Sequence, residues 1–276
     1  MRKLWLCHKN RNCARFSPCP RLVCKRLLRY NPSVDYNVVV SGVSDNIKVV
    51  ERRIQSAAER TGRNPASVVL ICVSKTIEPG AIEEAVRAGA TIFGESKVQE
   101  AKAKIPLVSG RAHWHMIGHL QSNKARDAVA LFDVIHSVDS LRLAEELNKW
   151  AEQAGKTQAV MLEVNVSGES SKFGLKPEDL ESTFTSVNRL PRVEARGLMT
   201  VAPFTEEAEA ARPYFRRLRE LRDGLGLTEL SMGMSHDFEV AIEEGATMVR
   251  VGTAIFGERK AAGRAGRRGE AVEEDT

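Results

Sequence analysis

Lys75 is the residue of this chain best placed for nucleophilic chemistry. It follows the apolar run 68–73, and strand alternation puts it on one face with Val69, Ile71 and Val73. An amine in such surroundings is partly desolvated, holds its proton less firmly and can attack an aldehyde. A lysine that simply extends into solvent from a strand end would occupy the same position. The choice between the two interpretations needs a second feature.

That second feature lies near the C-terminus of the chain. Arg250 stands among apolar residues in the run 248–253, where an unpaired guanidinium is costly to bury and needs an electron-rich partner. Gly252 and Thr253 follow it, and their backbone amides at a helix start suit a phosphate. A second turn of small and polar residues upstream contains Ser231, Met232 and Ser235. A lysine combined with a phosphate cradle predicts a ligand that carries both an aldehyde and a phosphate.

These residues must be held by a sheet, and the chain contains eight short runs of strand type: 68–75, 91–95, 113–119, 134–138, 159–166, 193–200, 229–233 and 248–253. Helical patterns fill the gaps at 79–88, 97–104, 123–130, 141–154, 177–188, 206–225 and 238–244, and another at 44–61 precedes the first strand. Eight alternating units predict an α/β protein with a single TIM (β/α)8 barrel and an extra N-terminal helix. The alternative is a doubly wound open sheet. Such a sheet typically has a glycine-rich dinucleotide-binding turn after its first strand, whereas Ser74, Lys75 and Thr76 stand there in this chain.

In such barrels the functional site lies at the carboxyl ends of the strands. Asn165 and Met199 belong to the ends of two of these runs and are predicted to line the same barrel mouth as Lys75. Alternation would also place three histidines on one face, which raises a metal hypothesis for His113, His115 and His119. No carboxylate or cysteine stands at ligand spacing from them, so we expect structural histidines and no metal.

Composition excludes several classes of function. Residues 1–36 hold nine of the 41 basic residues and one of the 36 acidic ones, so the remainder is mildly acidic and a nucleic-acid partner is not expected. No apolar stretch is long enough to span a membrane. Only Cys72 lies beyond the first 24 residues, which rules out a disulfide framework in the barrel and fits a reducing, cytoplasmic location.

The two ends of the chain differ from its centre. Residues 1–43 form a basic leader that we expect to be disordered, and it contains Cys7, Cys13, Cys19 and Cys24. An organelle transit peptide, a zinc-binding tail and an upstream extension that is not part of the natural protein are the alternatives, and we favour the extension. Residues 44–260 form the barrel, and residues 261–276 form a Gly-, Arg- and Glu-rich tail that we also expect to be disordered.

The same residues carry a resemblance to a known family. The chain resembles the pyridoxal phosphate homeostasis proteins of the YggS/PROSC type over residues 44–260. The matching segments are Val-Ser-Lys-Thr at 73–76, Phe-Gly-Glu at 93–95, Trp-His-Met-Ile-Gly-His-Leu-Gln-Ser-Asn-Lys at 114–124, Ser-Val-Asp-Ser at 137–140, Val-Asn-Val-Ser-Gly-Glu at 164–169, Gly-Leu-Met-Thr at 197–200, Ser-Met-Gly-Met-Ser at 231–235 and Val-Arg-Val-Gly-Thr-Ala-Ile-Phe-Gly at 249–257.

This resemblance implies a barrel of the fold-type III kind, similar to the N-terminal domain of alanine racemase, with pyridoxal 5'-phosphate (PLP) held as a Schiff base on Lys75. It places the phosphate near Ser231, Met232, Ser235, Gly252 and Thr253. Arg250 would approach the pyridine nitrogen or the phosphate, and Asn165 and Met199 complete the set of expected cofactor-binding residues. Lys172 is a candidate secondary acceptor of the cofactor.

The resemblance implies a PLP-binding protein of intracellular PLP homeostasis with no established catalytic turnover, acting as a monomer or weak dimer, with PLP-dependent apoenzymes as candidate partners. A racemase-like enzyme is the alternative. It would need a second base opposite the lysine, which similar racemases take from a tyrosine of an additional domain, whereas the tyrosines here are Tyr30, Tyr36 and Tyr214. A lysine-dependent aldolase is a third hypothesis and predicts no bound chromophore.

Overall fold

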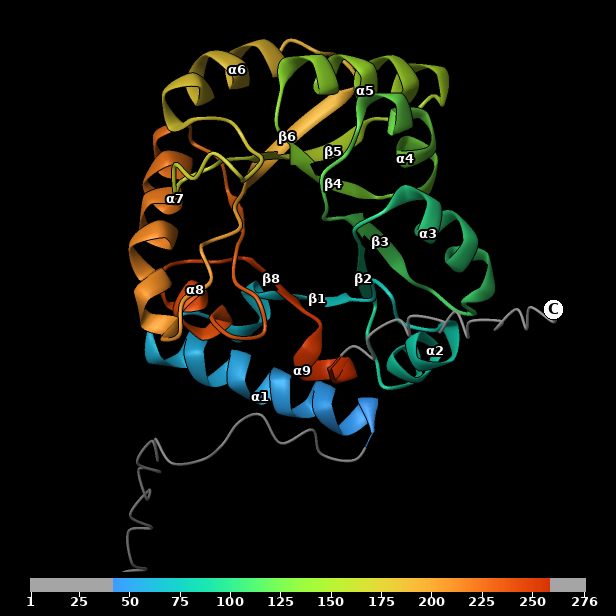
Figure 1. The fold of residues 1–276 in the computed structure, drawn as a ribbon, viewed down its shortest axis with the longest axis vertical. Coiled ribbons are helices and arrows are strands. Elements are labelled where there is room, and N and C mark those ends of the chain that lie inside the picture. The colour runs from blue at the N-terminus through green and yellow to red at the C-terminus, as the bar shows by residue number, and fades with distance from the viewer. Residues whose placement is uncertain (1–41, 259–276) are drawn as a thin grey trace, which may run out of the picture. The chain divides into compact units, whose positions relative to one another are not determined.

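A closed parallel barrel is the centre of the fold (Figure 1). The computed structural model describes residues 42–258. The predicted leader, apart from residues 42 and 43, and the predicted tail lie outside this range. The strands follow one another around the barrel in chain order, and the last pairs with the first. Their bounds are β1 Val69–Val73, β2 Ile92–Glu95, β3 His113–Met116, β4 Val134–Val138, β5 Gln158–Glu163, β6 Val193–Met199, β7 Glu229–Ser231 and β8 Met248–Val251. The predicted TIM barrel is confirmed.

Helices surround the sheet on its outside, as Figure 1 shows. They are α1 Val43–Arg60, α2 Pro79–Arg87, α3 Val98–Lys104, α4 Ala125–Leu131, α5 Leu141–Gln153, α6 Leu180–Val187, α7 Arg212–Gly224, α8 Phe238–Glu243 and the short α9 Thr253–Phe256. Gly89 and Gly245 follow α2 and α8 with φ values of 101° and 102°, a positive φ that glycine adopts readily at helix ends. Within residues 42–258, no helix has the length and the apolar character needed to cross a membrane.

Strand alternation divides the apolar residues into two groups. The larger group fills the space between the sheet and the helices. A smaller group lies inside the barrel and includes Ile71, Met161, Met199 and Met248. Towards the carboxyl ends of the strands this interior becomes polar, with His115, His136, Ser231 and Arg250 all buried. The barrel is therefore a packed core with a polar upper layer, and that layer forms the floor of the mouth.

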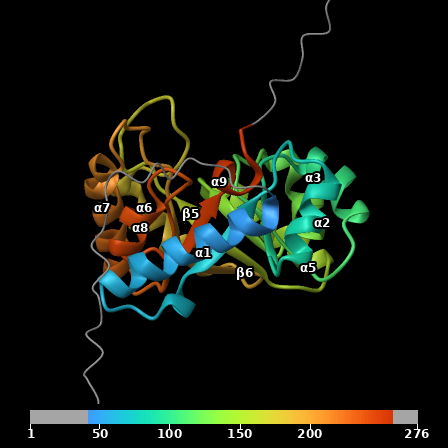
Figure 2. The same cartoon turned by 90° about the horizontal axis from the view of Figure 1, so that it is seen from below.

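Helix α1 supports the seam where the barrel closes. It runs along the outside of the barrel in contact with α8 and α9, as Figure 2 shows from below. Ile47, Val50 and Ile54 are buried along one face of the helix. The side-chain amide of Asn46, also buried, donates a 2.8 Å hydrogen bond to the carbonyl of Ile255 in α9. The extra N-terminal helix thus fixes the turn that follows β8.

Several strands end earlier than their apolar patterns predict. The run 68–75 becomes a strand that stops at Val73, because the carbonyl of Ser74 accepts a hydrogen bond from the amide of Ile77 and the chain turns. The run 113–119 stops at Met116. Lys75 and His119 consequently lie in loops at the barrel mouth instead of on strands.

Candidate functional site

Lys75 occupies a tight turn directly after β1. The turn is closed by the 3.0 Å hydrogen bond from the amide of Ile77 to the carbonyl of Ser74, with Lys75 and Thr76 as its central residues. The side chain of Lys75 is half-buried. The sequence prediction of a strand-end lysine at the mouth agrees with this position, although a turn and not strand alternation sets the direction of its side chain.

The turn after β8 lies beside the end of β1. The two strands pair in parallel, with Cys72 opposite Val251. A β-carbon added to Gly252 would come within 3.3 Å of the carbonyl oxygen of Val73. The Lys75 turn and the Gly252 turn therefore belong to neighbouring strand ends at the same mouth, which the hypothesis of one small ligand spanning both requires.

The loops after β7 and β8 are joined by Ser235. Its hydroxyl oxygen accepts hydrogen bonds from the backbone amides of Gly252, at 3.2 Å, and Ala254, at 3.4 Å. An oxygen already sits against these amides, which shows that the turn can receive an oxygen acceptor. Thr253 is exposed at the start of α9. The predicted residues Ser235, Gly252 and Thr253 are thus brought together.

Gly233 allows the loop after β7 to pack closely. Its φ is 90°, and a β-carbon there would lie 2.6 Å from Cβ of Ala241 and 2.8 Å from Cα of Phe238. The neighbouring Met232 is fully buried among the outer core residues, and its backbone amide donates to the carbonyl of Met248. Met232 therefore faces away from the mouth, and any contact it makes with a ligand there would come through its backbone position.

Arg250 is the cation of the barrel interior and is 4% exposed. Its Nη1 donates to the hydroxyl of Ser231 at 2.6 Å, and its Nη2 donates to the carbonyl of Thr200 at 2.8 Å. Burial lowers the pKa of this guanidinium to about 10, while the nearby carboxylates of Glu163 and Asp237 raise it. The arginine therefore stays charged at neutral pH. The hydroxyl of Ser231 and the carbonyl of Thr200 are the electron-rich partners that the sequence predicted for it.

Two buried histidines extend this network. His136 Nδ1 lies 2.9 Å from the hydroxyl of Ser231, and His136 Nε2 lies 2.9 Å from His115 Nδ1. Burial lowers the pKa of both rings, that of His115 to about 4, so both are neutral at pH 7. Arginine only donates, so the arrangement that satisfies every group has Ser231 donating to His136 and His136 donating to His115. The charge of Arg250 thus orients three neutral side chains.

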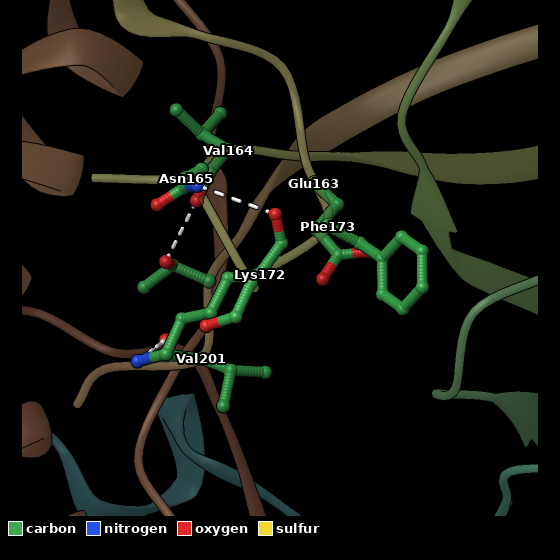
Figure 3. A pocket seen from close by; sticks show the side chains of 8 residues that line it. Glu163, Val164, Asn165, Lys172, Phe173 and Val201 are labelled. Carbon is green, nitrogen blue, oxygen red and sulfur yellow. Dashed lines mark hydrogen bonds between the residues drawn. The ribbon is translucent and has the colours of Figure 1, made fainter. Parts of the chain in front are cut away.

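Glu163, the last residue of β5, faces a small cavity beside this network. The cavity has a volume of about 190 Å³ and is lined by Val164, Asn165, Ser171, Lys172, Phe173, Thr200 and Val201 in addition to Glu163 (Figure 3). One carboxylate oxygen of Glu163 is buried and has no hydrogen-bond partner among the described residues. Burial, and then the charge of Asp139, raise the pKa of Glu163 to about 7, against the opposing effect of Arg250.

Replacing Glu163 by glutamine is expected to make the protein more stable at alkaline pH. The folded-state pKa of about 7 exceeds the ordinary value of 4.5, so the free energy of unfolding falls as the pH rises through this window. Glutamine has no proton to lose, and the variant should gain up to about 3 kcal/mol above pH 7 and little below pH 4.5. Urea unfolding at both extremes measures this, with the exposed Glu145→Gln as control. A gain that is equal at both pH values would contradict the expectation.

Asn165 and Met199 have different positions at the mouth. Asn165 lines the cavity, and its amide donates to the carbonyls of Glu169 and Lys172 while its oxygen accepts from Ser167 and Gly168. These bonds shape the loop after β5. Met199 ends β6 and is buried inside the barrel. Their predicted contacts with a cofactor stay predictions.

Of the three histidines considered for a metal, His113 and His115 alternate along β3, whereas His119 does not belong to this strand. His113 is exposed and lies 3.4 Å from Asp133, whereas His115 belongs to the buried network. His119 lies beyond the end of β3, pairs with Asp139 at 3.2 Å and stacks on Phe173. A common face of all three histidines is therefore wrong, because β3 ends at Met116 and does not reach His119. Within residues 42–258, no group of three His, Cys, Asp or Glu side chains is arranged to hold a metal.

Comparisons with known proteins agree with this architecture. The family model described as the N-terminal domain of alanine racemase matches residues 46–260. A pyridoxal phosphate homeostasis protein of Aquifex aeolicus is 47% identical over 223 residues, which cover 78% of this chain and 98% of that protein. An alanine racemase of Clostridium difficile has 15% identity and a TM-score of 0.60, covering 79% of this chain and 58% of the racemase, and this likeness concerns the fold alone.

A solved relative holds a ligand. PipY of Synechococcus elongatus, with PLP bound, is 40% identical, with a TM-score of 0.67 and coverage of 78% of this chain and 100% of PipY. The homeostasis protein of Escherichia coli is 40% identical over 229 residues, covering 80% of this chain and 98% of that protein. Matches at this identity over nearly the full length of these relatives establish common descent. The chain therefore belongs to the pyridoxal phosphate homeostasis protein family.

Proposed function

We propose that this chain binds PLP at the barrel mouth, holds it as a Schiff base on Lys75 and serves in intracellular PLP homeostasis without catalytic turnover. The observation that carries the proposal is the juxtaposition of the Lys75 turn and the Gly252 turn on neighbouring strands, with Arg250 buried close by in the barrel interior. PLP, when bound, supplies an electrophilic aldehyde and a ring that can withdraw electrons.

The polar turns after β7 and β8 fit the phosphate of such a ligand. The backbone amides of Gly252 and Ala254 already contact one hydroxyl oxygen, and Gly233 leaves no room for a side chain in the adjoining turn. TIM barrels often build a phosphate site from the loops after these two strands. Ser235, Gly252 and Thr253 would hold the phosphate, with Ser231 and Met232 at the base of the same loop.

A carrier is preferred to a racemase because no tyrosine among residues 42–258 is placed at the mouth as an acid-base group, and the expected place of Arg250 fits a weak electron sink. A guanidinium next to the pyridine nitrogen disfavours protonation of that nitrogen and weakens the ring as an electron sink. Arg250 stays a cation at neutral pH although burial lowers its pKa to about 10, and its hydrogen bonds to Ser231 and Thr200 limit its freedom to move. Tyr214, which could supply an acid-base group, lies in α7 and packs against the outer core.

Borohydride reduction of the PLP-loaded protein followed by peptide mapping tests the covalent link. The pyridoxyl group should be found on the peptide that contains Lys75. Finding it chiefly on Lys172, which faces the neighbouring cavity, would contradict the proposal. Incubation of the loaded protein with L- and D-alanine in heavy water tests turnover, and sustained exchange of the α-proton would favour the racemase-like alternative.

The cellular role has two further parts. We infer that the protein acts in the cytoplasm as a monomer or weak dimer, and that PLP-dependent apoenzymes receive the cofactor from it. Sedimentation at increasing protein concentration measures the oligomeric state. Activation of an apoenzyme by the loaded protein, compared with the same amount of PLP left free in solution, measures delivery. Equal activation rates in the presence of an excess of a PLP-trapping amine would argue against direct delivery.

A further inference from the structure

The turn that contains Lys75 has an unfavourable backbone conformation. Thr76, next to Lys75, has φ of 64°, and it is the one non-glycine residue with positive φ among the described residues. Position three of a turn with this φ prefers glycine or asparagine, and a β-branched threonine is a poor choice. Such conformations persist only where surrounding contacts impose them, and they are frequent at functional sites.

Three side chains impose this conformation from the neighbouring β2 and α3. The ammonium group of Lys104 donates to the carbonyl of Ser74 at 2.8 Å, to Glu95 at 2.8 Å and to Glu100 at 2.7 Å. The hydroxyl of Ser74 donates to Glu95 at 2.7 Å. The backbone amide of Thr76 donates to Glu100. The backbone is thus held on both sides of Lys75.

The ion pair at the centre of this group is deeply buried. The side chains of Lys104 and Glu95 are 8% and 0% exposed. Burial raises the pKa of Glu95 despite its contacts with Lys104 and Ser74. A buried ion pair often contributes less to stability than apolar residues of the same volume, because both charges lose their hydration. A gain in stability is therefore a poor reason for burying Lys104 and Glu95. Their hydrogen bonds to Ser74 indicate that they position the turn instead.

We propose that Lys104, together with Glu95 and Glu100, is a positioning group that holds the Ser74–Ile77 turn in the conformation that presents the amine of Lys75 to the barrel mouth. This inference rests on the proposed function of Lys75. Lys104 and its two carboxylate partners take no part in bond formation, and they act through the backbone of Ser74 and Thr76.

The test compares Lys104→Met with Lys102→Met, a change of an exposed lysine on the same helix. The dissociation constant for PLP, from the visible absorption of the Schiff base in folded protein, should rise at least about tenfold in Lys104→Met and stay unchanged in Lys102→Met. Adding Thr76→Gly should recover much of the loss, because glycine adopts positive φ without strain. A merely structural role would lower the melting temperature without this rescue.

Two further measurements cover the other outcomes. If Lys104→Met does not fold, Glu100→Ala removes the acceptor of the Thr76 amide at a partly exposed position, and Glu100→Gln, which keeps an acceptor, is its matched control. If wild-type protein fails to bind PLP, the proposed function fails. Hydrogen exchange of the Thr76 amide in unloaded protein then still tests whether Lys104 and its two carboxylate partners hold the turn. We expect exchange to quicken about tenfold in Lys104→Met and Glu100→Ala. Unchanged exchange and unchanged PLP affinity in both variants would overturn the inference.

Discussion

Lys75→Ala is expected to give a colourless protein that releases PLP readily. Without the amine no covalent bond to the aldehyde can form, and only the contacts of the phosphate and the ring remain. We expect the dissociation constant to rise at least about 100-fold, which corresponds to about 2.7 kcal/mol. Equilibrium dialysis against PLP measures this loss, and the absorption spectrum shows whether a Schiff base persists.

The matched control for this experiment is Lys172→Ala. Lys172 lines the adjacent cavity and donates to the carbonyl of Val201 at 3.3 Å, so it is a second lysine near the mouth that could compete for the aldehyde. This variant should keep both the colour and the affinity. Lys75 is half-buried at a turn, and its removal should leave the barrel folded. Full colour in Lys75→Ala would remove the central residue from the proposed function.

The second large effect is expected in Arg250→Met, which should lower the free energy of unfolding by about 3–5 kcal/mol. The substitution removes the donors to Ser231 and Thr200. It also leaves the carboxylates of Glu163 and Asp237 without the cation that opposes their desolvation. Removing one partner from a buried charged network lowers the free energy of unfolding much more than replacing the whole network by apolar residues would. Urea unfolding at neutral pH measures the change.

Arg142→Met, an exposed change on α5, serves as its control and should shift stability by less than about 0.5 kcal/mol. The double variant Arg250→Met with Glu163→Gln should have a higher free energy of unfolding than the sum of the two single changes gives. Glutamine removes one of the carboxylates that Arg250→Met leaves uncompensated. A small effect of Arg250→Met would show that water or rearranged side chains replace the guanidinium.

The fold followed from patterns that are local in the sequence. Eight apolar runs alternating with helical periodicity led to the barrel, because each unit is a short-range feature and the closed arrangement follows from their number. The position of Lys75 at the mouth and the pairing of its strand with that of Gly252 also followed from this topology. Strand ends were less accurate: the turn at Ser74 is closed by a backbone hydrogen bond that an apolar pattern does not show, and β3 stops at Met116 although the strand-type run continues.

The polar partners were not found from the sequence, although some signals were present. His136 alternates with Val134, an interior residue, and the same alternation would have placed the ring inside the barrel. Lys104 follows Val98 and Ala101 on the buried face of α3, an unusual place for a lysine. Neither pattern names the partner: Ser231 comes from β7, far from His136 in the sequence, and Glu95 is met by Lys104 only through the packing of α3 against β2. The roles of Asn165, Met199 and Met232 at the mouth stay predictions for the same reason.

The closure of the barrel between β1 and β8 has a consequence for biosynthesis. These strands are about 180 residues apart, and the two halves of the proposed PLP site lie on opposite sides of this seam. Joining segments so distant in the chain is entropically demanding and is expected late in folding. A nascent chain on the ribosome would therefore lack a complete site until its last strand emerged, and capture of PLP would then hold the first and last strands together.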